Sequence, residues 1–290
     1  MGLIETGIAA GLLLSGAALA LMSTFRLMRF PDITVEGSFL AGAAIWAGLV
    51  RHDFDPNGAA LLAALGGAAC GATTALLHRV LGIDRFLAGI LVAAACYSIA
   101  LLGVGVPNAG LFATPGQIVT GLDVAATPLL AGVIFAALLA VAVYAFFKSR
   151  LGLRARAAAI NPRLLSNAVG RPLPYLVAGL AFANGLAALS GVAFARYQGF
   201  FDVGMGQGIL ITALAALAIG EAVIGWTRLP LVWAAIIGAI AGSALYQIAL
   251  GAALVAGAPT AATRLVSAVI VLIFLAVQFR RFADADERSA

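Results

Sequence analysis

Residues 126–147 read ATPLLAGVIFAALLAVAVYAFF and contain no charged side chain. About 20 helical residues, rising 1.5 Å each, cross the roughly 30 Å hydrocarbon layer of a bilayer. The whole chain shares this character, because 63% of its 290 residues are hydrophobic and 10% are charged. Soluble domains carry about 45–50% apolar and about 25% charged residues. Much of the chain is therefore expected to be surrounded by lipid.

Comparable apolar runs recur along the chain and predict nine membrane-spanning α-helices. Backbone groups in lipid must be satisfied within their own segment, which favours helix. The runs are residues 3–22, 33–50, 57–77, 86–105, 126–147, 173–195, 204–224, 231–256 and 265–279. Run 33–50 is short and run 204–224 begins with glycines, so either is expected to be a broken or re-entrant helix, within a range of eight to ten. The fold class is an all-α polytopic membrane bundle, one domain over residues 1–290.

Basic residues predict the orientation of this bundle. Loops rich in Arg and Lys stay in the cytoplasm. The loop 148–172 has no acidic residue and carries Lys148, Arg150, Arg154, Arg156, Arg163 and Arg171. Counting spans in both directions from this loop puts the N-terminus outside and the C-terminus in the cytoplasm. The first run lacks a basic leading region, so we interpret it as a retained span.

Two carboxylates stand at the head of the run RFPDITVEGSFLAGAAIWAGLV, residues 29–50. Asp32 and Glu36 fit two interpretations. In the first, both lie at the membrane interface, where the positive end of a helix favours acidic side chains. In the second, Glu36 faces the interior of the bundle at a break in the helix, because an ionisable side chain within a span is costly in lipid.

Glycine and alanine fill the predicted spans and let helices approach closely. The segment Gly66–Thr74, GGAACGATT, is the predicted packing face. In the segment ARYQGFFDVGMGQGILITALAALAIGEAVIG, residues 195–225, four glycines predict a tight turn or the start of a half-helix. Glu221 near the end of that run is expected to pair with Arg228. Residues 106–125 are too polar to span, and we expect them at the outer surface or folded back into the protein.

No group of residues predicts catalysis. His52 and His78 lack partners at metal-ligand spacing, and no phosphate-binding loop ending in Gly-Lys is present. Cys70 and Cys96 are interpreted as small core residues. We therefore expect neither enzymatic activity, nor a metal, nor a cofactor in this chain. Its basic residues follow the loops, so nucleic acid is not an expected partner.

The basic loop predicts two short helices broken at Asn161-Pro162, since proline disfavours helix in the residue before it and starts a helix well. The second helix would show an apolar face made of Leu164, Leu165, Ala168 and Val169. An apolar face in so short a loop favours a partner surface over water. A solvated loop that merely obeys the charge rule is the alternative.

Three segments resemble the permease subunits of ABC importers of the branched-chain amino acid and ribose class, in the subgroup paired with a periplasmic solute-binding lipoprotein. They are PDITVEGSFLAGA, LAGILVAAACYSIALLGVGVPNAGLF and NGLAALSGVAFARYQGFFDVGMGQGILITALAALAIGE. The loop GLRARAAAINPRLLSNAVG resembles that family's G-x-x-x-R-A-x-x-x-N-P pattern, although Ala159 and Ile160 stand where the family has glycine shortly before the asparagine.

The resemblance implies a permease in a bacterial inner membrane that moves a small solute inward by alternating access. It implies three partners: cytoplasmic ATPase subunits, which hold ATP and magnesium, an external solute-binding protein, and a second permease copy in a homodimer or heterodimer. The implied coupling residues in the loop are Arg154, Arg156, Asn161, Pro162, Arg163, Leu164 and Leu165.

Candidates for the translocation pathway are Glu36, Ser38, Phe39, Tyr97, Asn108, Tyr197, Gln198 and Asp202. Trp46, Phe112 and Phe200 are further aromatic candidates. The solute is expected to be an amino acid or a related compound, with a sugar or nucleoside-like solute as the alternative. An ion-coupled secondary transporter is the alternative function, although such a protein would favour repeated halves and buried acids.

Overall fold

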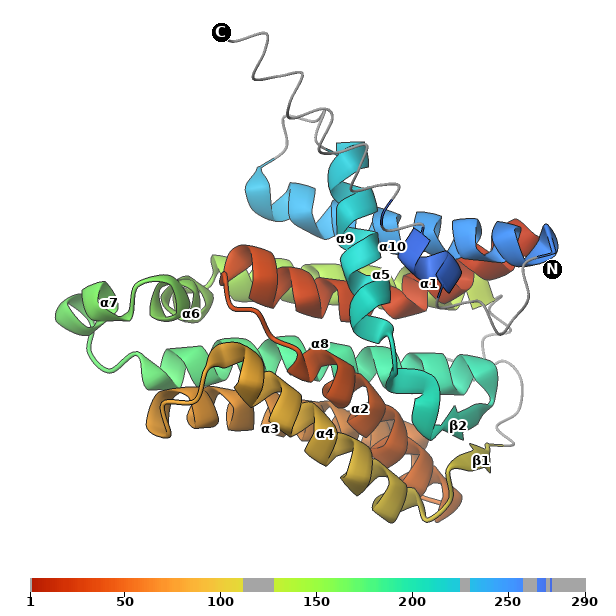
Figure 1. Cartoon of the computed structure of the whole chain (residues 1–290), viewed down its shortest axis with the longest axis horizontal. Helices are drawn as coiled ribbons and strands as arrows, with labels where there is room; N and C mark the ends of the chain where they lie inside the picture. Colours follow the sequence, from red (N-terminus) through yellow and green to blue (C-terminus); the bar gives the residue numbers. More distant parts are fainter. Residues whose placement is uncertain (1, 112–127, 225–229, 258–264, 270–271, 273–290) are drawn as a thin grey trace, which may run out of the picture.

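The computed structural model describes residues 2–111, 128–224, 230–257, 265–269 and 272, and most of them lie in helices (Figure 1). The α-helices are α1 (Leu3–Leu21), α2 (Thr34–Arg51), α3 (Pro56–Val80), α4 (Arg85–Val104), α5 (Pro128–Lys148), α6 (Arg150–Ile160), α7 (Pro162–Ala168), α8 (Leu173–Gln198), α9 (Ile209–Ile224) and α10 (Leu231–Val255). A π-helical turn η1 (Met22–Leu27) follows α1, and a 3-10 turn η2 (Val203–Gly206) precedes α9. Strands β1 (Asn108–Gly110) and β2 (Phe200–Asp202) pair antiparallel. The predicted all-α membrane bundle is confirmed.

Seven helices within the described residues are long and apolar enough to cross a membrane. They correspond to seven of the nine predicted runs. Run 33–50 forms α2, whose apolar part Thr34–Val50 is shorter than the others, and run 204–224 begins as η2. Both runs that were expected to be irregular therefore depart from a plain spanning α-helix. Run 265–279 and the stretch 106–125 lie largely outside the described residues.

Helix α8 lies at the centre of the bundle, packed against α1 on one side and α2 and α3 on the other (Figure 1). Helices α5 and α10 pack on α1, α4 packs on α2, and α9 packs mainly on α10. Helices α6 and α7 project at one end of the bundle, which we name the α6–α7 end. Strands β1 and β2 pair at the opposite end, which we name the ribbon end.

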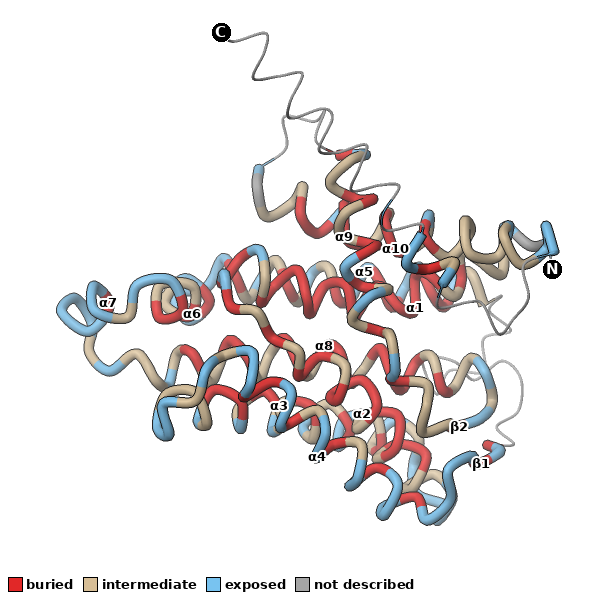
Figure 2. Tube along the Cα trace, in the orientation of Figure 1, coloured by how far each residue is buried: buried red, intermediate tan, exposed pale blue. Residues whose placement is uncertain are grey.

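Small residues set the distance between α3 and α8. A Cβ on Gly67 would overlap Ala188, and a Cβ on Gly71 would overlap the carbonyl oxygen of Leu180. The predicted packing face Gly66–Thr74 is therefore confirmed. Close backbone approach replaces, in lipid, the hydrophobic drive that holds soluble helices together. Figure 2 shows the result as buried faces on α1, α2 and α8, while α3 and α4 expose one side.

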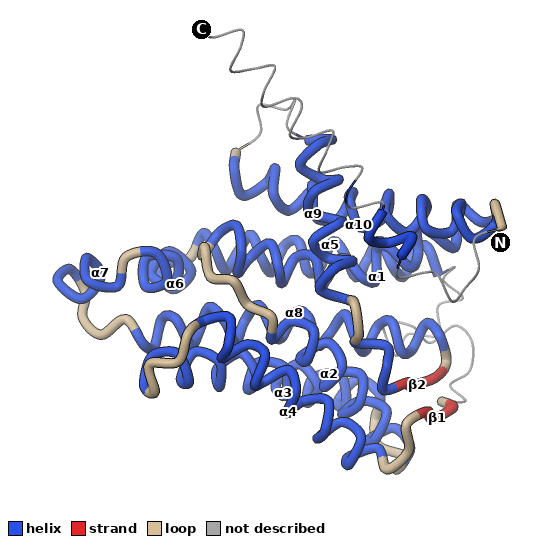
Figure 3. Tube along the Cα trace, in the orientation of Figure 1, coloured by secondary structure: helices blue, strands red, loops and turns tan. Residues whose placement is uncertain are grey.

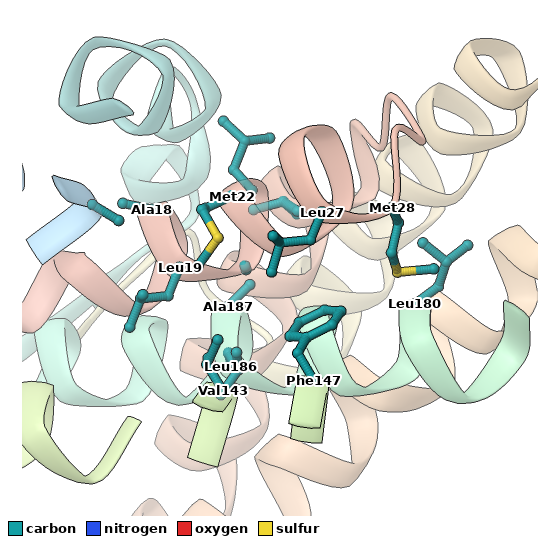
Figure 4. Packing of buried hydrophobic residues seen from close by; sticks show 14 of the residues in the cluster. Ala18, Leu19, Met22, Leu27, Met28, Val143, Phe147, Leu180, Leu186 and Ala187 are labelled. Carbon is teal, nitrogen blue, oxygen red and sulfur yellow. The ribbon is translucent and has the colours of Figure 1, made fainter. Parts of the chain in front are cut away.

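The main buried cluster joins α1, η1, α5 and α8 near the α6–α7 end (Figure 4). Its labelled members are Ala18, Leu19, Met22, Leu27, Met28, Val143, Phe147, Leu180, Leu186 and Ala187. Burial of each large aliphatic side chain contributes about 1.5–3 kcal/mol where the unfolded state exposes it to water. The cluster packs the end of α1 against α5, the helix that α6 follows in the chain.

An extended connection, residues 28–33, joins η1 to α2 (Figure 3). Pro31 disfavours helix at Phe30, so the helical chain stops before it. Arg29 takes a positive φ of 53°, and the Phe30 N–H donates to the Thr24 carbonyl at 2.8 Å. Phe30 and Asp32 are both fully buried. The connection therefore carries the chain back into the bundle, where α2 begins.

Glu221 forms an ion pair with Arg26, whereas the predicted pairing with Arg228 is not tested. Arg228 lies outside the described residues. The pair ties α9 to η1, which are far apart in sequence. The fold brings the end of the first span beside α9, a contact that the sequence analysis did not predict.

Candidate functional site

Glu36 stands in the first turn of α2, where the helix begins inside the bundle. Its Oε1 accepts a hydrogen bond from the backbone N–H of Gly208 at 3.2 Å. Gly208 belongs to the connection between η2 and α9, so this bond joins the two irregular segments of the chain. Irregular backbone at membrane depth is tolerated where protein or a cavity surrounds it. The geometry favours the second interpretation of Glu36, a carboxylate inside the protein at a helix break.

A cavity of about 570 Å³ adjoins this contact. Ligand sites for small molecules commonly measure about 300–1,000 Å³. Helix α2, helix α4 and the η2–α9 connection form its walls. The lining residues are Ile33, Glu36, Gly37, Leu40, Ile90, Ala93, Ala94, Tyr97, Ser98, Gly206 and Gln207. The walls are thus largely apolar, with a few polar groups placed around one carboxylate.

Glycines shape the wall opposite Glu36. Gly199 ends α8 with a φ of +75°, and Gly208 has a φ of +89°, a region that other residues seldom adopt. Between them, the Asp202 Oδ1 accepts the Gly204 N–H at 2.7 Å and caps η2. A Cβ on Gly206 would lie 2.9 Å from the Leu40 Cβ. The predicted turn is thus η2 with its connection to α9, and the backbone geometry holds that connection against α2.

A buried polar cluster fixes the start of α2 next to the cavity. Asp32 accepts the Thr34 N–H at 2.9 Å through Oδ1 and the Asn184 side-chain amide at 2.7 Å through Oδ2. The Ser38 hydroxyl donates to the Asn184 Oδ1 at 2.7 Å. Thr34 and Thr74 hydroxyls lie 2.6 Å apart. All of these side chains are fully buried. The cluster joins α2 to α8 and α3, and it corrects the interpretation of Asp32 as an interfacial residue.

The predicted pathway residues separate into four places. Glu36 and Tyr97 line the cavity together. Ser38 and Phe39 are fully buried, Ser38 against Asn184 and Phe39 beside Phe194, with 6.2 Å between the ring centroids. Asn108 and Asp202 are partners in the β1–β2 ribbon, and Tyr197 and Gln198 end α8 near it.

Of the additional aromatic candidates, the two that the structure describes do not line the cavity. Trp46 is buried, with its indole N–H donating to the Pro56 carbonyl at 3.1 Å, and Phe200 belongs to β2. Phe112 lies outside the described residues. The cavity's aromatic character therefore comes from Tyr97 alone among the described candidates.

Sequence reasoning missed Asn184, Ser98 and Gln207. Asn184 carried a usable signal, because an amide side chain in the middle of an apolar run needs a partner within the protein. Ser98 and Gln207 carried none, since serine satisfies itself along a helix and Gln207 stands in a turn. Their position beside Glu36 arises from packing of α4 and the η2–α9 connection on α2.

The basic loop forms two short helices, α6 and α7, which are broken at Asn161-Pro162 as predicted. The Asn161 Oδ1 accepts the Leu164 N–H at 3.1 Å and so caps α7. Arg163 and Asn161 are exposed. The predicted apolar face of α7 is divided, because Leu164 is 64% exposed whereas Leu165 is 4% exposed. Leu165 packs into the bundle core, so only Leu164 of this pair is available to a partner.

Arginines bind α6 to the rest of the bundle. Arg154 donates to the Tyr175 hydroxyl at 3.1 Å, and Arg156 donates to the Leu27 carbonyl at 3.3 Å. Arg85, at the start of α4, donates to the Ala159 carbonyl at 3.4 Å and to the Arg29 carbonyl at 3.3 Å. Its guanidinium also lies 5.3 Å from the centre of the Phe30 ring. The Leu27 carbonyl precedes the connection that leads to α2, and the Arg29 carbonyl belongs to it.

Other titratable side chains show no metal-binding geometry: no group of three or more His, Cys, Asp or Glu side chains suited to a metal occurs among the described residues. His78 bonds to the Ile83 carbonyl at 2.8 Å and faces Phe30 edge-on. Cys70 and Cys96 are free cysteines that face each other between α3 and α4, with 3.1 Å between their sulfur atoms. Each of these residues serves packing between helices.

The seven long apolar helices among the described residues define the chain as a multi-pass membrane protein, with a part-apolar cavity beside the start of α2. Residues 3–276 match the model of the family described as the branched-chain amino acid transport system / permease component. The chain belongs to this family, so it is a permease component of a transport system.

Two curated relatives extend the match. A "Tyrosine transport system permease protein" of Clostridioides difficile (strain R20291) is 31% identical over 269 residues, which cover 91% of this chain and 88% of the relative. An "Uncharacterized protein RP368" of Rickettsia prowazekii (strain Madrid E) is 30% identical over 223 residues, 76% of this chain and 78% of the relative. No solved structure matches the chain.

Proposed function

We propose that this permease is the membrane subunit of a bacterial ABC importer, driven by a separate cytoplasmic ATPase that docks on α6 and α7. The observation that carries the proposal is the exposed apolar surface of these helices. Leu164 is 64% exposed, and Leu151, Leu153 and Ile160 on α6 are 43–53% exposed, at an end of the bundle rich in arginine. Such a surface outside the apolar spans favours a protein partner.

Hydrogen bonds from α6 offer a route by which that partner acts on the cavity. Arg156 reaches the Leu27 carbonyl, and Arg85 connects the Ala159 carbonyl of α6 to the Arg29 carbonyl. Residues 28–33, which include Asp32, lead directly into the start of α2, where Glu36 lines the cavity. A movement of α6 therefore shifts the start of α2. Transport then requires two packing states of the bundle, selected by the partner's nucleotide state.

The proposed orientation places the α6–α7 end in the cytoplasm, the N-terminus outside and the C-terminus inside, in the bacterial inner membrane. Supporting this, Arg85 contacts both the Arg29 and Ala159 carbonyls, so basic segments distant in sequence gather at one end. The ribbon end would receive an external solute-binding protein. A second copy of the permease would complete the assembly. ATP and magnesium would bind the partner ATPase.

The proposed solute is an amino acid or a related small compound. The family's description and the tyrosine permease of Clostridioides difficile support this class. A cavity with one carboxylate, one tyrosine and apolar walls suits a solute with both charged and apolar parts. Selection among amino acids would rest largely with the external binding protein.

The test is co-purification of a tagged permease from its native membrane. We expect an ATP-hydrolysing subunit with the wild type and its loss with Leu164→Asp, because a charge on an exposed apolar contact must be desolvated on docking. Phe54→Asp is the matched control, since Phe54 is 44% exposed beyond the far end of α2. Absence of any ATPase from the wild type, combined with uptake by the purified chain under an ion gradient, would instead establish a secondary transporter.

A further inference from the structure

Two thiols face each other between α3 and α4. The sulfur atoms of Cys70 and Cys96 lie 3.1 Å apart, and both residues are free cysteines. The sequence contains only these two cysteines. The sulfur atoms of a disulfide lie about 2.05 Å apart, so an approach of about 1 Å would join the pair. An oxidant that reacts with one of these sulfur atoms therefore leaves the other in position to form a bond with it.

The pair is shielded from large molecules but lies close to the cavity beside α2. Ala93, Ala94 and Tyr97 of α4 line that cavity, and Cys96 belongs to the same turn. Cys96 is only 4% exposed, because its side chain is turned toward α3, whereas Cys70 is half-buried. Bulky reagents are therefore excluded from Cys96, and a small uncharged oxidant such as hydrogen peroxide reaches the pair through Cys70.

A bond between these sulfur atoms would connect two separately packed parts of the bundle. Helix α4 packs mainly on α2 and less on α3. A Cβ on Gly37 of α2 would overlap the Cα of Ala93, so α2 and α4 touch through their backbones at the cavity wall. Helix α3 is held against α8, since a Cβ on Gly71, the neighbour of Cys70, would overlap the α8 backbone. A disulfide to Cys96 would therefore fasten α4, and with it the start of α2, to the packed pair α3 and α8.

We propose that Cys70 and Cys96 form a dithiol that hydrogen peroxide oxidises to a disulfide, and that this bond arrests transport by fixing α4 to α3. The Cys70 sulfur attacks one peroxide oxygen, the O–O bond breaks, and a sulfenic acid and one water form. The Cys96 sulfur then attacks the sulfenic sulfur, the S–O bond breaks, and the disulfide and a second water form. In total the two thiols lose two protons and two electrons, which convert the peroxide to water. A thiol reductant reverses the reaction by exchange. The arrest rests on the proposed transport function, whereas the oxidation does not.

The first experiment counts free thiols in the purified full-length permease, without transport. After peroxide treatment the protein is denatured and reacts with a polyethylene glycol maleimide, which shifts its gel band once for each free thiol. We expect two tags before oxidation, none after it, and two again after treatment with dithiothreitol. Intact mass should show the loss of two hydrogen atoms. Two tags retained after peroxide, or oxygen added to the cysteines in place of that loss, would overturn the proposal.

Moving one thiol by a helical turn gives the matched control. In the variant Cys96→Ala/Ala100→Cys the thiol stays at a buried position of α4, since Ala100 is 3% exposed. It moves about 6 Å along the helix axis, away from Cys70. This variant should keep two tags under conditions that oxidise the wild type completely. An equal yield of disulfide in the variant would overturn the proposal, and the count for the wild type itself requires no variant to fold.

The second experiment measures uptake by the complete reconstituted transporter, with L-tyrosine as the probe solute. Uptake should fall in proportion to the oxidised fraction and recover with dithiothreitol, while the Cys70→Ala/Cys96→Ala permease keeps its uptake through the same peroxide treatment. Full uptake by a completely oxidised wild type would overturn the arrest and leave the importer function standing. A reduced wild type that neither binds an ATPase nor imports solute would refute the proposed function, whereas the thiol counts would still decide whether the dithiol forms a disulfide.

Discussion

Replacement of Asn184 by alanine should strongly destabilise the bundle. Its side-chain amide donates to Asp32 at 2.7 Å, and its Oδ1 accepts from Ser38 at 2.7 Å, with all three side chains fully buried. An alanine leaves both partners without this bond. Each buried polar group left unsatisfied costs about 1–3 kcal/mol, so we expect a loss of about 2–6 kcal/mol in the free energy of unfolding.

A double-mutant cycle between Asp32→Ala and Asn184→Ala isolates the bond between them. Hydrogen bonds between membrane helices contribute about 0.6 kcal/mol on average, whereas bonds to charged groups contribute about 1.5–3 kcal/mol. Both oxygens of Asp32 accept N–H bonds. The coupling energy should therefore be about 0.6 kcal/mol or more.

The assay is unfolding of the purified protein in mixed micelles, followed by tryptophan fluorescence. Trp46 is a suitable reporter because it is buried and bonded to the Pro56 carbonyl. Asn57→Ala is the control, since Asn57 is exposed at the start of α3, and it should change stability by less than about 0.5 kcal/mol. An Asn184→Ala protein as stable as this control, or additive effects in the cycle, would refute the cluster's role.

Further predictions concern packing and coupling. Gly71→Ala should destabilise the fold, because the added Cβ would overlap the Leu180 carbonyl oxygen. Gly103→Ala should be neutral, or stabilising by up to about 1 kcal/mol, because alanine has the higher helix propensity. Thermal unfolding of the two variants compares them. Leu165→Asp should unfold or destabilise the protein by about 3 kcal/mol or more, unlike the same change at its exposed neighbour, and detergent stability measures this. Arg85→Lys should lower ATP-driven uptake several-fold while the ATPase still binds, because one ammonium group cannot reproduce the fork between two carbonyls; unchanged uptake would contradict the proposed route.

Much of the fold could be predicted from apolar run lengths. Runs such as 57–77 and 173–195 became α3 and α8, because lipid forces a long apolar segment to satisfy its own backbone. The break at Asn161-Pro162 was also predictable, since proline acts locally. Partners distant in sequence were not predictable, as the pairing of Glu221 with Arg26 shows. The residues around Glu221 carry no information about which helix lies beside α9.

The candidate site was predictable in outline only. Glu36 was recognisable as a carboxylate in an apolar run, and glycines marked the segment that meets it. Asp32 looked the same in sequence, yet it is buried with Asn184, because residues 28–33 re-enter the bundle. Leu164 and Leu165 are chemically identical, and only the docking of α7 on the core separates an exposed leucine from a buried one.

The proposed ATPase contact is tested most directly by photo-crosslinking from α7 in native membranes. A benzophenone amino acid replaces Leu164 in one protein and Leu165 in the other. The account predicts an adduct with an ATP-hydrolysing subunit from position 164, which is exposed, and none from position 165, which is buried in the permease. The account would be contradicted if position 164 gave no ATPase adduct and crosslinked only to lipid or to an external protein.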